Sequence, residues 1–146
     1  MDIDSYRIFY AEKLSDGCIK VNHEDFPLCY PFQQEWVTCC GNLGNEIEMA
    51  KDLTITYAVC FFFAKYKFPK AIIKGDIQIV LPYCCALKIM LRNLMIEERY
   101  TLSNLAKLSG TSKQNLRSQL DLRKKTHIDT LANLFEIIGH KLNICC

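Results

Sequence analysis

The chain has 146 residues, enough for one domain of ordinary size or for two small ones. Half of the residues are hydrophobic and 23% are charged, a balance that excludes a disordered chain and predicts a globular one. The net charge of +2 is unevenly distributed: residues 99–146 hold eight Lys or Arg against three acidic residues, whereas residues 1–98 hold ten against thirteen. We therefore expect a basic C-terminal half and an acidic N-terminal half to bind different partners.

The nine cysteines are odd in number and no cleavable apolar leader follows Met1, so we expect a cytoplasmic protein whose thiols are mostly reduced, small, buried side chains. Six of them form adjacent pairs, at residues 39–40, 84–85 and 145–146. Because no CxxC spacing offers two thiolates to one ion, we expect no metal and no cofactor. The longest apolar stretch, residues 57–64, is far shorter than the ~20 residues that cross a bilayer, so no membrane contact is expected.

In the N-terminal half the pattern predicts the order β-β-β-α-β. Asp16-Gly17 is a turn sequence typical of a hairpin between two β-prone runs. A longer segment without Gly or Pro repeats apolar residues every three or four positions, which indicates a helix with one buried face, and Pro69 is expected to end it. The expected strands are 7–10, 18–21, 35–38 and 77–81, and the expected helix is 45–66.

The pattern of the C-terminal half predicts helices. Pro82 is suited to the start of the first one. They are expected at 83–98, 101–108, 112–120 and 128–138, and residues 141–144 are expected to add a short strand. The fold class is therefore α+β. We expect one domain at residues 1–82 and a second, all-α domain at residues 83–146.

Residues 101–120 have the pattern of a helix-turn-helix. Ala106 supplies a small residue where two short helices would cross, and Gly110 tolerates positive φ in the turn. Thr111 or Ser112 can cap the second helix with its hydroxyl. The residues expected to face inward are Leu102, Leu105, Leu108, Leu116 and Leu120.

The outward face of the second helix would then carry polar side chains suited to DNA. The residues expected to read the major groove are Ser112, Lys113, Gln114, Asn115, Arg117 and Ser118. Arg123, Lys124 and Lys125 are expected to contact phosphates, as Lys113 also can. Arg can pair with guanine, and Asn and Gln with adenine. Two alternatives stay open: the polar face is simply solvated, or the helices bind protein and not DNA.

The stretch from Leu116 to Ile144 resembles the C-terminal domain of HicB antitoxins that carry an XRE-type helix-turn-helix. The segments that carry the resemblance are Leu120-Asp-Leu122, Thr126-His-Ile-Asp-Thr-Leu131 and Ile138-Gly-His-Lys-Leu142. The N-terminal half resembles the family more loosely, through Asp25-Phe-Pro27, Val37-Thr38 with Gly41, and the helix positions Glu46, Ala50 and Leu53. The extra residue at Cys39-Cys40 and the segment Pro69-Lys-Ala71 depart from the family pattern.

The resemblance implies an antitoxin whose partial ribonuclease-H-like N-terminal domain binds and neutralises a HicA-type toxin, an mRNA-cleaving ribonuclease. It also implies a C-terminal domain that forms homodimers or tetramers and represses its own operon by binding operator DNA. A toxin that holds RNA must be basic, so an acidic surface can attract it. Our candidates for toxin binding are Glu46, Glu48 and Asp52, although acidic residues also favour the start of a helix for purely structural reasons.

Two other classes of protein fit parts of the sequence. A stand-alone phage-type repressor would use its N-terminal half for oligomerisation or for another ligand. A metal-dependent nuclease would need the acidic residues of the first 25 positions, with His23, to form a cluster. Those residues fall in a terminus, turns and loops, where acidic side chains are ordinarily solvated, so we expect no enzyme and no catalytic residues.

Overall fold

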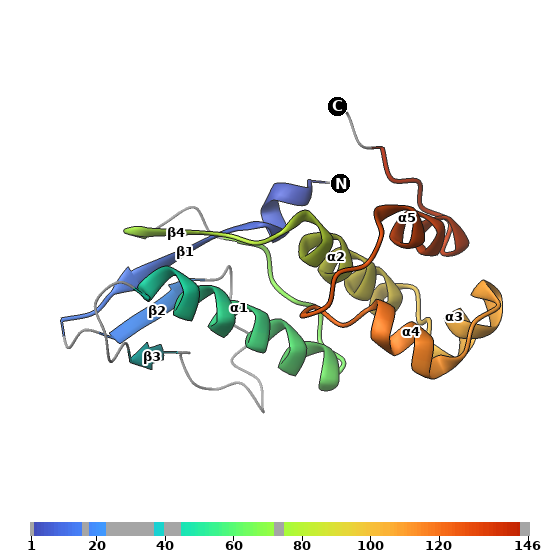
Figure 1. The fold of residues 1–146 in the computed structure, drawn as a ribbon, viewed down its shortest axis with the longest axis horizontal. Coiled ribbons are helices and arrows are strands. Elements are labelled where there is room, and N and C mark those ends of the chain that lie inside the picture. The colour runs from blue at the N-terminus through green and yellow to red at the C-terminus, as the bar shows by residue number, and fades with distance from the viewer. Residues whose placement is uncertain (1, 16–17, 23–36, 40–44, 72–74, 144–146) are drawn as a thin grey trace.

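The computed structural model describes residues 2–15, 18–22, 37–39, 45–71 and 75–143. In these residues the chain forms a four-stranded sheet with one helix against it at one end of the molecule, and a group of four helices that extends to the other end (Figure 1). This is the predicted α+β fold, with the expected order β-β-β-α-β followed by helices. A short 3₁₀ helix, Ile3–Tyr6, precedes the first strand and was not predicted.

The sheet has the order β3-β2-β1-β4, and all neighbouring strands are antiparallel. Its strands are β1 (Ile8–Lys13), β2 (Cys18–Asn22), β3 (Val37–Cys39) and β4 (Ile77–Val80). In β1, Phe9 and Ala11 are fully buried and alternate with more exposed neighbours, the two-residue period of a strand with one face on a core. The predicted Asp16-Gly17 turn and residues 35–36 of the predicted third strand lie outside the described residues.

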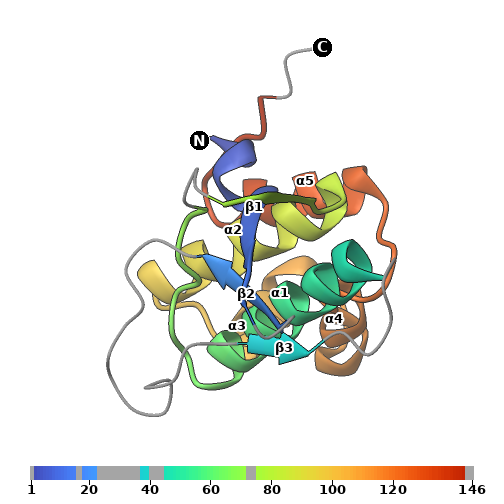
Figure 2. The same cartoon turned by 90° about the vertical axis from the view of Figure 1, so that its left-hand side faces the viewer.

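Helix α1 (Glu46–Phe63) lies along one face of the sheet in both views (Figures 1 and 2). The side chains that are fully buried between them are Phe9, Ala11, Ile19, Ala50, Tyr57, Ala58, Phe61 and Ile79. The helix ends three residues before the predicted end at residue 66, because Lys65 adopts φ +62°. The N–H of Lys65 donates to Phe62 O (3.1 Å) and that of Tyr66 to Phe61 O (2.9 Å), which is the Schellman arrangement that closes a helix.

Helix α2 (Tyr83–Glu97) is apolar on nearly all sides and contributes to two hydrophobic cores. Its Cys85 and Ile89 belong to the core under the sheet, and its Leu87 and Leu91 to a second core among the helices. The buried Asn93 joins α2 to the segment after α1: its Oδ1 accepts from Phe68 N–H (2.8 Å) and its Nδ2 donates to Phe68 O (3.0 Å). Helix α2 therefore joins the sheet and α1 to the helices that follow.

The second core is completed by α3 (Leu102–Ser109), α4 (Lys113–Gln119) and α5 (Ile128–Ile137). Leu105, Leu116 and Leu120 are fully buried as predicted, and Leu102 is partly buried. Leu108 is 59% exposed, so its predicted inward position is wrong. The buried stripe of α3 follows a three- and four-residue step through positions 102, 105, 106 and 109, which leaves position 108 on the solvent side.

The predicted strand at residues 141–144 is wrong over the residues that the structure describes. Residues 141–143 have no regular secondary structure and pair with none of the described strands; Ile144 lies outside the described residues. Cys18 is disulfide-bonded, whereas most of the nine thiols are expected to be reduced. None of the described helices combines the length and the apolar character that crossing a bilayer requires.

Candidate nucleic-acid interface

A tight turn joins α3 and α4, and hydrogen bonds close the end of α3 and cap the start of α4. Gly110 has φ +70° and ends α3, with Thr111 N–H donating to Ala106 O at 3.1 Å. The hydroxyl of Ser112 then caps α4 by accepting from Asn115 N–H at 3.1 Å. Ala106 is 4% exposed. The predicted positive φ at residue 110 and the predicted cap at residue 112 are both confirmed.

The outward face of α4 is open to solvent. All six residues predicted to read DNA are exposed: Ser112, Lys113, Gln114, Asn115, Arg117 and Ser118. The Asn115 amide donates to Thr111 Oγ1 (2.7 Å), which fixes its orientation at the start of the helix. Leu116 and Leu120 hold the opposite face in the second core, so α4 is anchored by its apolar side and presents its polar side.

Two basic residues of α2 fix the end of α4 and the turn that follows. The buried Lys88 donates from Nζ to the carbonyl oxygens of Asp121 (2.7 Å) and Lys124 (2.6 Å), and Arg92 donates to Leu120 O (3.4 Å). Cations at these carbonyls also stabilise the C-terminal end of α4, where the helix dipole is negative. Burial lowers the pKa of Lys88 and of Arg92 from their ordinary values. Neither residue could be predicted from the sequence, because both stand inside an apolar run and carry no local signal of this role.

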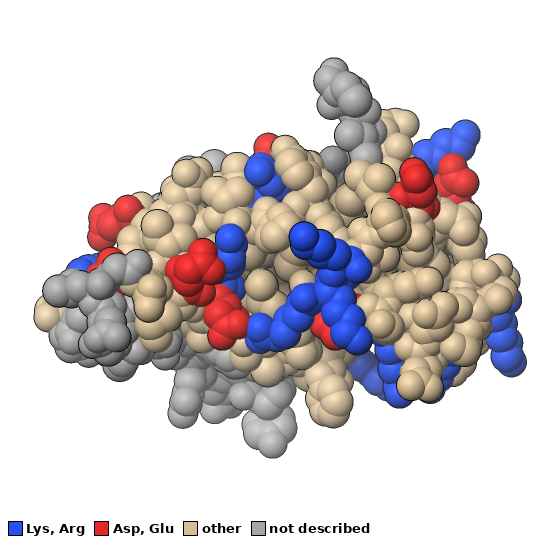
Figure 3. All heavy atoms as spheres, viewed as in Figure 1, with Lys and Arg blue, Asp and Glu red and all other residues tan. Residues whose placement is uncertain are grey.

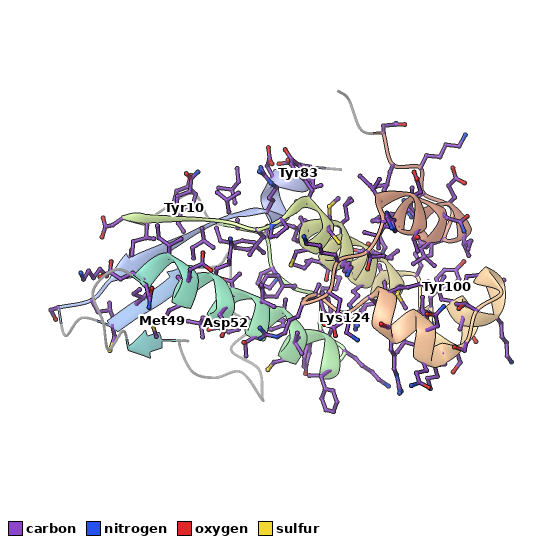
Figure 4. All side chains as sticks on the ribbon, in the orientation of Figure 1. Tyr10, Met49, Asp52, Tyr83, Tyr100 and Lys124 are labelled. Atoms are coloured by element: carbon purple, nitrogen blue, oxygen red, sulfur yellow. The ribbon has the colours of Figure 1, made fainter. Side chains whose placement is uncertain are left out.

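The basic segment after α4 does not point uniformly to solvent. Arg123 extends to α1, where Nη1 pairs with Asp52 Oδ1 (2.6 Å) and Nη2 donates to Thr56 Oγ1 (2.8 Å). Lys124 and Lys125 are exposed, and Lys124 Nζ lies 3.3 Å from Ser118 Oγ. Figure 4 shows Asp52 on α1 and Lys124 on the neighbouring segment. Arg123, which was predicted to contact phosphate, is thus paired with Asp52, which was predicted to contact the toxin.

The three acidic candidates on α1 have different surroundings. Glu46 pairs with Lys13 of β1, with Oε1 and Nζ 2.8 Å apart. Glu48 and Asp52 line a groove of about 390 Å³ along the exposed side of the helix, together with Met49. On the face drawn in Figure 3, acidic side chains over α1 border a group of Lys and Arg side chains. Glu48 and Asp52 are therefore the two candidates that share an open surface.

The part of the chain that the structure describes contains no group of three or more His, Cys, Asp or Glu side chains that could hold a metal ion. Asp16, His23, Glu24 and Asp25 of the nuclease alternative lie outside the described residues. The site that the described residues build is a polar, partly basic surface around α4.

No family model matches the chain. Among curated proteins, it is 27% identical over 128 residues to Antitoxin HicB 2 of Photorhabdus laumondii, across 86% of this chain and 92% of that protein. It is 32% identical over 133 residues to Antitoxin HicB 1 of the same organism, across 91% of this chain and 81% of that protein. Both similarities run through the sheet and the helices alike, so the chain belongs to the HicB family of antitoxins.

Proposed function

We propose that this protein is an antitoxin that binds and neutralises a HicA-type, mRNA-cleaving toxin and represses its own operon by binding promoter DNA. The observation that carries the DNA-binding part is the exposed face of α4, where Lys113, Gln114, Asn115 and Arg117 extend from a helix whose other side is fixed in the core. Family membership supports the antitoxin part.

For DNA binding, the α3–α4 pair acts as a helix-turn-helix and α4 enters the major groove. Arg117 is suited to guanine and Gln114 to adenine, because their side chains offer matching pairs of hydrogen-bonding groups. Lys125 is suited to a phosphate, which adds affinity without sequence preference. A homodimer would place two copies of α4 about 34 Å apart on an inverted repeat.

For toxin binding, residues 1–82 form the partner surface and residues 83–146 form the DNA-binding and dimerising part. The groove along α1 offers Glu48 and Asp52 beside the apolar side chains of Met49 and Leu53. Carboxylates at such a surface speed the encounter with a basic protein, while apolar contacts hold the complex.

The DNA-binding part is tested by comparing Arg117→Ala with Lys125→Ala on operator and scrambled duplexes. Arg117→Ala should lose about 1–3 kcal/mol of preference for the operator, because it removes a base contact. Lys125→Ala should weaken both duplexes equally and lower the salt dependence of log Kd by about one unit, because it removes a phosphate contact. Equal behaviour of the two variants would contradict these assignments.

Toxin binding is tested by co-expression with a HicA-type toxin. The wild type should co-purify with it and restore growth, and Glu48→Lys should weaken both effects by reversing a charge in the groove. Asp129→Lys is the matched control, since Asp129 is an exposed acidic residue in the first turn of α5. If the wild type forms no complex but still binds DNA, the protein is a stand-alone repressor and the antitoxin proposal fails.

A further inference from the structure

A cavity of about 500 Å³ opens beside α4, between the C-terminal ends of α1 and α2 and the start of α3. Phe62, Met95 and Leu102 give it an apolar floor, and Tyr100, labelled in Figure 4, lies at its α2–α3 side. Its basic lining residues are Lys65, Arg92, Arg99, Lys113 and Arg117. No described residue that lines it is acidic. We call it the cationic pocket.

The charges at the mouth of the cationic pocket are not neutralised within the described part of the chain. Lys65, Arg99, Lys113 and Arg117 are exposed. None of them forms an ion pair or a side-chain hydrogen bond with a described residue. Arg92 differs, because it lies deeper, donates to Leu120 O and stands over the Phe62 ring at 5.3 Å. Four cations thus share one opening, and no carboxylate among the described lining residues balances them.

Two of these cations occupy positions that helices usually give to glycine. Lys65 follows α1 with φ +62°, and Arg99 follows α2 with φ +59°. In both places the N–H groups of this residue and the next close a Schellman motif, as Gly110 does after α3 and Gly139 after α5. Residues with side chains are uncommon at positive φ, and such backbone positions cluster at functional sites. The described residues other than glycine that have positive φ are these two, and both line the cationic pocket.

We propose that the cationic pocket binds phosphates of the DNA backbone next to the groove that α4 reads; this inference rests on the proposed DNA-binding function. Lys113 and Arg117 belong both to the pocket and to the exposed face of α4, so the two surfaces are continuous. Uncompensated cations around one opening match a polyanion whose charges repeat along a strand. The DNA contact surface therefore includes the end of α1, a helix of the N-terminal half.

A helix C-terminus also attracts cations through its dipole, so the test must separate this structural role from DNA binding. Lys65→Gly and Arg99→Gly remove the charge and also relieve the positive φ. Each should lower affinity for operator and scrambled duplexes alike by about three- to tenfold and reduce the slope of log Kd against log salt by about 0.9, without lowering Tm. Lys65→Arg should bind as the wild type does.

Lys70→Ala is the matched control, because Lys70 is an exposed lysine outside the cationic pocket; it should change Kd less than twofold. If both glycine variants bind DNA like this control, the pocket inference is wrong, while loss of operator preference in Arg117→Ala would leave the proposed function standing. A weakened affinity that accompanies a lower Tm would assign the two cations to helix stability and also overturn the inference. If the wild type binds neither duplex, the proposed function itself fails.

Discussion

Cys85 lies at the junction of the two cores, 3% exposed and directly beside Cys84. Burial raises the pKa of its thiol from 9.0 to about 11, with a smaller contribution from Cys84. In the unfolded chain the thiol ionises near pH 9, whereas in the folded protein it stays protonated until about pH 11. The unfolded state therefore binds fewer protons in this range, and stability that is complete below pH 9 is lost as the pH rises towards 11.

We predict that Cys85→Ala weakens this alkaline loss of stability. Between pH 8.5 and pH 11 the wild type should lose about 2 kcal/mol more unfolding free energy than the variant, because one pKa unit corresponds to about 1.4 kcal/mol. Chemical unfolding at the two pH values measures the difference. The lowered pKa of Lys88 acts in the opposite direction in both proteins, and Cys85→Ala lowers it further because Cys85 is one of the groups that raise it, so this change adds to the expected difference. Identical pH profiles for the two proteins would contradict the assignment to Cys85.

At the scale of helices and strands, the periodicity of apolar residues predicted those features that depend on the local sequence. The strands and helices lie close to their expected positions, because apolar residues recur along most of them at the spacing of a strand or of a helix. The end of α1 was misplaced because Lys65 occupies a position where glycine is the usual signal. Leu108 was misassigned because a leucine at helical spacing is expected inside, while the crossing of α3 with its neighbours selects a different stripe.

In the candidate interface, too, the local features could be predicted from the sequence and the contacts between distant residues could not. The exposed face of α4 follows from the buried leucines beside it, so its residues could be named from the sequence. The Asn93 contacts to Phe68 join residues 25 apart, and Arg123 reaches Asp52 across 71 residues. Such pairs depend on how the elements pack. The sequence around a lone Asn in an apolar helix, or around a basic run, does not indicate which residue will be its partner.

At the scale of the whole molecule, α2 is shared by both cores, and surface ion pairs cross between the halves. Arg123 connects the segment after α4 to Asp52 and Thr56 on α1, and Lys67 pairs with Glu97 of α2 at 2.7 Å. The side chains of Arg123 and Asp52 are 49% and 66% exposed, so water and salt screen their attraction. The apolar side chains that α2 buries in both cores, and not these ion pairs, supply most of the free energy that holds the halves together.

We predict a small, salt-sensitive coupling between Asp52→Ala and Arg123→Ala in a double-mutant cycle. The coupling free energy should be about 0.2–1 kcal/mol at low salt, the range of exposed ion pairs, and should fall at high salt. The bond to Thr56 fixes the guanidinium near Asp52, which favours the upper part of that range. Asp52→Ala with Lys125→Ala is the control cycle and should be additive, since no bond joins this pair. A coupling of several kcal/mol would mean that Asp52 and Arg123 form a structural link that the unfolding of either half must break, whereas no coupling would leave Arg123 free to bind phosphate.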